Sequence, residues 1–127
     1  MNTITKTLTN SEIYEVAVNL NNNFANNGTY FPALAAFAIQ KNRDTLTALA
    51  QELENSRLQV AKHYGEEQTP GSYIIAPENM LKANEELNEL LDASQDVKIY
   101  TINIESLKDA RLTSQEMSSI LFMIEEE

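Results

Sequence analysis

A single helical run, from Pro32 to Tyr64, constrains the fold more than any other part of this sequence. Along it, apolar residues recur at alternating steps of three and four, the pattern of a helix that packs lengthwise against another helix. The positions of this seam are Ile39, Asn42, Leu46, Leu49, Leu53, Ser56, Val60 and His63. Two of them, Asn42 and Ser56, are polar, and a polar residue in such a seam fixes the register of pairing.

We therefore predict a helix-pairing interface that includes every seam position before His63. Its residues are Ile39, Asn42, Leu46, Leu49, Leu53, Ser56 and Val60. The alternative is an ordinary core stripe with polar interruptions.

The length of the run also matters. An unbroken helix over residues 32–64 spans about 50 Å at 1.5 Å per residue, more than a domain of this size needs for its own core. We expect part of it to project from the domain or to pair with another chain, as in a homo-oligomer. The alternative is a break at residues 41–44, because Asn and Asp often cap the start of a new helix.

Two other helices begin at clear capping boxes. Thr9 is followed three residues later by Glu12, and Thr113 is followed three residues later by Glu116. In this motif each side chain bonds the backbone N–H of the other residue. The first of these helices is expected to end before Gly28, which suits a left-handed cap.

Two short segments, at about residues 73–76 and 97–104, have the β-branched and aromatic composition of strands. Between them, Pro77 predicts the start of a helix that ends near Ala93. Because an isolated strand leaves its backbone groups unpaired, we expect the two strands to pair in one small sheet.

The predicted fold class is α+β and predominantly α. It has about four helices, one long central helix at about residues 32–64, and a two-stranded sheet of residues 73–76 and 97–104. A chain of 127 residues, 43% of them hydrophobic, is long enough for one core and short for two. We therefore expect a single domain over residues 1–127.

Charge is unevenly distributed. Residues 1–50 carry three basic and three acidic side chains, whereas residues 51–127 carry six basic and sixteen acidic ones. This balance disfavours direct binding to nucleic acid, which needs clustered Lys and Arg, and binding to an anionic membrane. A basic protein partner fits better. The predicted acidic partner surface consists of Glu78, Glu85, Glu86, Glu89 and Asp92. The alternative is that the charge only keeps the protein soluble.

Cysteine is absent, which fits a reducing cytoplasm and removes thiolate chemistry. The first ten residues lack the apolar segment of a signal peptide, and no run approaches ~18 apolar residues. We expect a soluble cytoplasmic protein.

The sequence carries no recognisable catalytic, metal or cofactor motif. His63 is the only histidine, and the three glycines are too far apart for a phosphate-binding loop. We predict that the protein is not an enzyme and uses no cofactor or metal. The alternative is a small-ligand pocket formed by Tyr30, Phe31 and Phe37, for which a core cluster is the simpler explanation.

Two segments resemble a group of small, uncharacterised acidic proteins encoded by phages and prophages. They are FAIQKNRDTLTALAQELENSRLQVAKHYG, residues 37–65, and LTSQEMSSILFMIEEE, residues 112–127. The resemblance implies a phage origin and therefore the cytoplasm of a bacterial host, and it supplies no catalytic residues.

Two classes of function follow. The first is a non-enzymatic protein that acts stoichiometrically by binding another protein, as an acidic antagonist of a host defence protein or as an assembly adaptor. The second is a protein that binds a nucleotide or a signalling metabolite.

Overall fold

The long helix is continuous and forms the spine of the molecule. In the computed structural model, which describes residues 2–24 and 29–125, helix α2 spans Ala33–Tyr64 without a break at residues 41–44. Pro32 precedes it as the N-cap, with an extended backbone (φ −56°, ψ 151°). Proline suits a helix start because it has no N–H to leave unpaired. The predicted long helix is confirmed.

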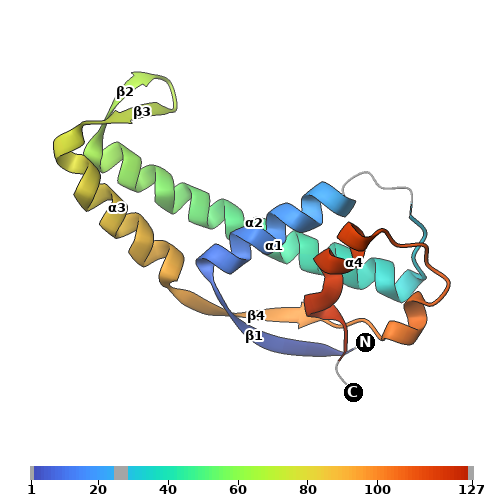
Figure 1. The fold of residues 1–127 in the computed structure, drawn as a ribbon. Coiled ribbons are helices and arrows are strands. Elements are labelled where there is room, and N and C mark those ends of the chain that lie inside the picture. The colour runs from blue at the N-terminus through green and yellow to red at the C-terminus, as the bar shows by residue number, and fades with distance from the viewer. Residues whose placement is uncertain (1, 25–28, 126–127) are drawn as a thin grey trace.

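Two helices lie one after the other along this spine (Figure 1). Helix α1, Asn10–Phe24, runs along the N-terminal half of α2, and helix α3, Pro77–Asp92, runs along the C-terminal half. Strands β2, Gly65–Thr69, and β3, Ser72–Ile75, join α2 to α3 at the far tip. We call residues 51–93 the arm and the rest of the described chain the body. The predicted cap at Gly28 lies outside the described residues.

The body contains nearly all of the buried apolar side chains. Ile13 and Leu20 of α1, Leu46 of α2, and Ile99 are fully buried there. The short helix α4, Ser114–Ile120, covers the end of this core, and 3₁₀ turns at Ile104–Leu107 and Leu121–Met123 flank it. Helix α4 begins at the predicted capping box of Thr113 and Glu116, with both bonds formed at 3.0 Å.

The fold class is confirmed, but the predicted pairing of the two strands is wrong. Strand β3, Ser72–Ile75, pairs with β2, Gly65–Thr69, in a hairpin at the tip of the arm. Strand β4, Ser94–Tyr100, pairs with β1, Thr3–Thr9, in the body. The two sheets are antiparallel and separate. Helix α3 carries the chain from the tip of the arm back to the body, and β4 continues from there away from the hairpin, so β3 and β4 lie beyond opposite ends of α3 (Figure 1).

One buried amide attaches the body sheet to the spine. Asn42 of α2 is completely buried, and its side chain donates to Tyr100 O and accepts from Tyr100 N, both at 2.8 Å. Figure 1 shows β4 lying between β1 and α2. Asn42 therefore pairs the backbone of Tyr100 on the side of β4 that faces α2.

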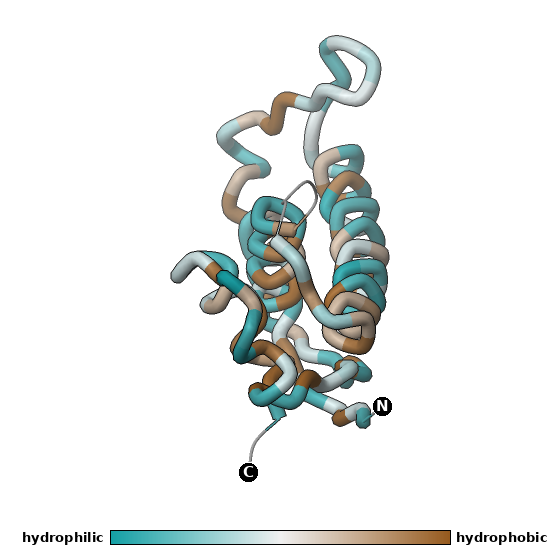
Figure 2. The backbone as a smooth tube through the Cα atoms, turned by 90° about the vertical axis from the view of Figure 1, so that its right-hand side faces the viewer, coloured by the Kyte–Doolittle hydropathy of each residue, from teal (hydrophilic) through white to brown (hydrophobic). Residues whose placement is uncertain are grey.

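The arm is thinly packed, which leads to a prediction about its dynamics. Among its residues only Leu53 and Ala83 are buried apolar side chains, and the hairpin at its tip is mainly hydrophilic (Figure 2). Because regions with few buried contacts open more readily, backbone amides of α3 are expected to exchange with solvent at least about tenfold faster than those of α1. Equal protection in the two helices, measured by hydrogen exchange, would contradict this.

In residues 2–24 and 29–125, the structure has no helix long and apolar enough to cross a membrane.

Candidate functional site

The first half of the seam packs inside the chain itself. Ile39, Leu46 and Leu53 are buried in the core, whereas Leu49 and Val60 are half-buried. The two polar positions behave differently. Asn42 bonds the backbone of β4, while Ser56 is exposed and donates only to the Glu52 carbonyl, one turn earlier. The seam from Ile39 to Leu53 is therefore already packed against other parts of the same chain. Only the positions after Leu53 are left partly or fully in contact with solvent.

The three aromatic residues of the alternative pocket are not brought together. Phe31 packs on Phe24, with ring centroids 5.7 Å apart, and Phe37 packs on Tyr100 at 5.9 Å. Tyr30 is 75% exposed. The two phenylalanines make separate aromatic contacts, and the cavities described below are lined by other residues.

The helix geometry of α3 places four of the five predicted acidic residues on one face and leaves Glu86 outside it. Glu85, Glu89 and Asp92 follow Glu78 by seven, eleven and fourteen residues, spacings that place all four exposed carboxylates on one face. Ala83, the buried residue of α3, lies on another face. We call these four residues the acidic stripe.

Glu86 is separate from the stripe. It forms a side-chain hydrogen bond with Tyr64 at the end of α2, and this bond raises the pKa of the Tyr64 hydroxyl above its usual value. Glu86 therefore links α3 to α2 across the arm, and the charge of Glu85, at the border of the stripe, also contributes to the raised pKa of Tyr64.

The carboxylates of the stripe form no ion pair among the described residues, although Lys82 lies on the same helix between Glu78 and Glu85. Within residues 2–24 and 29–125 the only ion pair joins Arg57 to Glu54 on α2. The arm as a whole carries nine acidic and three basic side chains. A negative potential around the arm is the physical consequence, because like charges there add rather than cancel.

Exposed apolar side chains accompany this charge. Leu81 on α3 is 71% exposed, and Ile74 on β3 is 60% exposed. Met80, next to Leu81, is 43% exposed. Apolar side chains left in solvent beside a polar border are typical of surfaces that bind other proteins.

Sequence reasoning did not single out Leu81, although a signal was present. Met80 and Leu81 are adjacent, and adjacent residues on a helix do not share a face. One of two neighbouring large apolar residues must therefore point away from the packed side.

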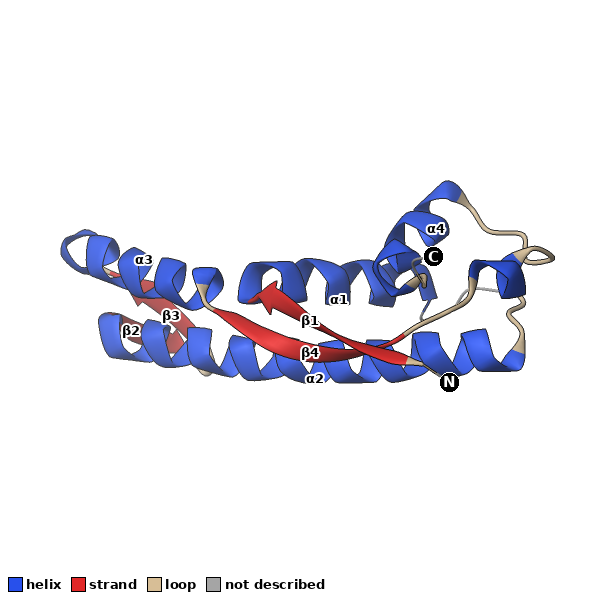
Figure 3. Cartoon of the chain, turned by 90° about the horizontal axis from the view of Figure 1, so that it is seen from below, coloured by secondary structure: helices blue, strands red, loops and turns tan. Residues whose placement is uncertain are grey.

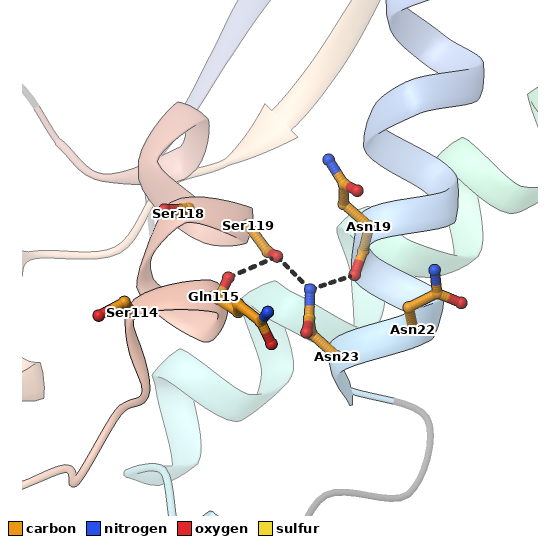
Figure 4. Close-up of a pocket in the computed structure, with 7 residues that line it drawn as sticks. All are labelled: Asn19, Asn22, Asn23, Ser114, Gln115, Ser118 and Ser119. Atoms are coloured by element: carbon orange, nitrogen blue, oxygen red, sulfur yellow. Dashed lines mark hydrogen bonds between the residues drawn. The ribbon is translucent and has the colours of Figure 1, made fainter.

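The structure also contains a polar cleft in the body (Figure 4). Its volume is about 450 Å³, and it lies between α1 and α4. Its lining consists of Asn19, Asn22, Asn23, Ser114, Gln115, Ser118 and Ser119. Asn23 Nδ2 donates to Ser119 Oγ at 2.6 Å and to Asn19 O at 2.9 Å. The lining offers neutral amides and hydroxyls, which hydrogen-bond a ligand but do not exchange protons with it near neutral pH.

The lone histidine packs on its neighbour. His63 and Tyr64 are in edge contact, with ring centroids 4.6 Å apart. Among the residues that the structure describes, no three His, Cys, Asp or Glu side chains are placed to hold one metal ion.

Comparison of the chain with protein-family models, curated protein sequences and solved structures found no match.

Proposed function

We propose that this chain is a phage- or prophage-encoded, non-enzymatic protein that acts stoichiometrically by binding another protein through its arm. The observation that carries the proposal is the exposed Leu81 beside four carboxylates without ion pairs. An apolar anchor with a charged border matches the usual anatomy of a protein interface, in which a central apolar group supplies affinity and the border supplies orientation.

The charge specifies the chemistry of the partner. A negative arm attracts a positively charged surface and raises the rate of encounter with it, while it repels phosphate backbones and anionic lipids. The partner we infer is a host or phage protein with a basic surface and an apolar recess for Leu81. A host defence protein whose basic surface binds nucleic acid fits this description, and the chain would then be its antagonist. An assembly adaptor that joins a basic phage component is the other form of the proposal. Both place the protein in the cytoplasm of a bacterial host.

The test is co-purification of the tagged chain from infected cells, followed by mass determination of the intact complex. The expected result is a protein partner at a fixed stoichiometry that is released by raised salt, because exposed charge interactions are screened. Recovery of the chain without any protein partner would contradict the proposal.

A second candidate function, binding of a nucleotide or signalling metabolite, is favoured by the polar cleft of Figure 4 rather than by Tyr30, Phe31 and Phe37. A ligand that binds the native state raises its melting temperature. A thermal-shift screen of such metabolites, repeated on Asn23→Leu and Ser119→Val, tests it. A shift that the cleft variants abolish would support this function, and no shift at saturating ligand would exclude the compounds screened.

A further inference from the structure

The two edges of the body sheet differ in the hydrogen bonding of their backbone groups. On β4, the N–H and C=O of Tyr100 point toward α2 and are bonded by Asn42. Thr3 lies directly opposite Tyr100 in the antiparallel pair. Because hydrogen-bonded and non-hydrogen-bonded pairs alternate along such a ladder, the backbone groups of Thr3, Thr5 and Thr7 point to the outer side of β1.

That outer side is open. Thr3, Thr5 and Thr7 are exposed. In the described part of the chain, none of their backbone groups takes part in a hydrogen bond beyond the sheet itself. Figure 1 shows β1 as the outer strand, with β4 between it and α2. The strand is seven residues long and pairs without a bulge. It also contains no proline, and Lys6 is its only charged side chain, so of the devices that block pairing at a sheet edge it carries a single lysine.

We propose that β1 is a dimerisation edge, which pairs antiparallel with β1 of a second copy of this chain about a two-fold axis at Thr5. In this register Thr5 faces Thr5 of the partner, and Thr3 faces the partner's Thr7. Every outward N–H and C=O of these three residues then finds a partner.

The side chains fit the same register. On the solvent face of the sheet threonine meets threonine, a cross-strand pair that is favourable between β-branched hydroxyl residues. On the core face, Ile4 meets the partner's Lys6. A register centred on Lys6 would place two lysines directly opposite each other, which is unfavourable. The sequence of β1 is therefore self-complementary about Thr5.

A hollow lies beside β1, and in the proposed register the partner's Lys6 is directed toward it. It has a volume of about 450 Å³, and it is lined by Ile4, Thr5 and Lys6 of β1 itself and by Asn2, Thr101, Ile124 and Glu125. The Glu125 carboxylate is held there by Thr101 Oγ1 at 3.0 Å and by Asn2 Nδ2 at 3.1 Å. An incoming Lys6 therefore places its aliphatic stem against Ile4 and its ammonium near a fixed carboxylate.

The net charge of −10 per chain does not oppose this arrangement strongly. Strand β1 runs in the same general direction as α2 (Figure 3), and the arm extends beyond one end of the sheet. Antiparallel pairing turns the second copy around, so the two acidic arms point to opposite ends of the dimer. Charges that far apart are screened at physiological ionic strength.

Single cysteines test the register, because the chain has none of its own. Cα atoms of a hydrogen-bonded antiparallel pair are about 5.5 Å apart, within the ~4.4–6.8 Å range of disulfides. Under a mild oxidant, Thr5→Cys is expected to form a covalent dimer. Thr7→Cys alone is expected to remain monomeric, while a mixture of Thr3→Cys and Thr7→Cys forms a dimer. Cross-linking of Thr7→Cys alone as fast as Thr5→Cys would overturn the proposal.

Sedimentation of the protein without cysteines gives an independent readout. The wild type is expected to show a concentration-dependent monomer–dimer equilibrium. Lys6→Glu is expected to be monomeric, and Lys6→Glu/Glu125→Lys is expected to recover the dimer. A wild type that stays monomeric at every concentration would overturn the proposal. Protection of the β1 amides from hydrogen exchange only in the presence of a different protein would overturn it as well. Persistence of the dimer in Lys6→Glu, with no gain in the double variant, would overturn the predicted register.

Discussion

Replacing Asn42 with alanine is expected to lower the free energy of unfolding by about 3 kcal/mol. The substitution removes the fully buried amide that pairs the backbone N–H and C=O of Tyr100, and each buried group left unsatisfied costs about 1–3 kcal/mol. The lost side-chain volume adds a cavity term. Urea denaturation followed by circular dichroism measures the change.

The substitution Asn42→Asp distinguishes the contribution of the hydrogen bonds to stability from the contribution of packing. Asn42→Asp keeps the shape, but its carboxylate cannot donate to Tyr100 O, and burial disfavours its charged form. The pKa of the introduced carboxyl group in the folded variant is therefore raised above its unfolded value. The folded state then binds more protons than the unfolded state between these two pKa values, so stability falls as pH rises through that window. The free energy of unfolding of Asn42→Asp is therefore expected to approach that of wild type as the pH is lowered toward the pKa of this carboxyl group in the unfolded chain. A deficit that stays constant with pH, or an Asn42→Ala variant within about 0.5 kcal/mol of wild type, would contradict this role.

Charge reversal in the acidic stripe is expected to weaken partner binding by about 30-fold, or about 2 kcal/mol. The variant is Glu85→Lys/Glu89→Lys, which replaces attraction to a basic surface by repulsion. Both residues are exposed, and Glu89 lies in the last turn of α3, where a lysine interacts favourably with the helix dipole, so the fold is expected to be unchanged. Titration calorimetry with the co-purified partner at two salt concentrations measures the loss.

A control on the body matches this change in net charge. Glu105→Lys/Asp109→Lys alters two exposed carboxylates outside the arm. It is expected to leave the affinity within about threefold of wild type, because exposed charges beyond the Debye length are screened. Equal losses in the two variants would show that overall charge, and not the stripe, drives binding.

The helices were largely predictable because their signals are local. The three-and-four spacing of apolar residues and the residues Pro32, Pro77 and Thr113 identify each helix within a few positions, and the structure confirms them. The polar interruption of the seam marks Asn42 as a position that fixes a register. The group that Asn42 holds in place is the backbone of Tyr100 at the edge of β4. Tyr100 lies 58 positions away in the sequence, so no pattern around Asn42 identifies it.

The strand pairing could not be predicted for the same reason. Strand β1 alternates threonine with Ile4, Lys6 and Leu8, which gives it too little apolar character to stand out as a strand. Its partner strand, β4, lies far away in the sequence. Without β1, the two visible strands could only be paired with each other. The acidic surface, in contrast, was predictable in composition, and only the separation of Glu86 from the stripe needed the structure.

The most direct measurement of the central claim is a hydrogen-exchange comparison of the free chain with the complex purified from infected cells. The account predicts slower exchange in α3 and in the β2–β3 hairpin on binding, with no change in α1 and α4 around the polar cleft. Protection confined to the cleft, with the amides of α3 exchanging as in the free chain, would contradict it.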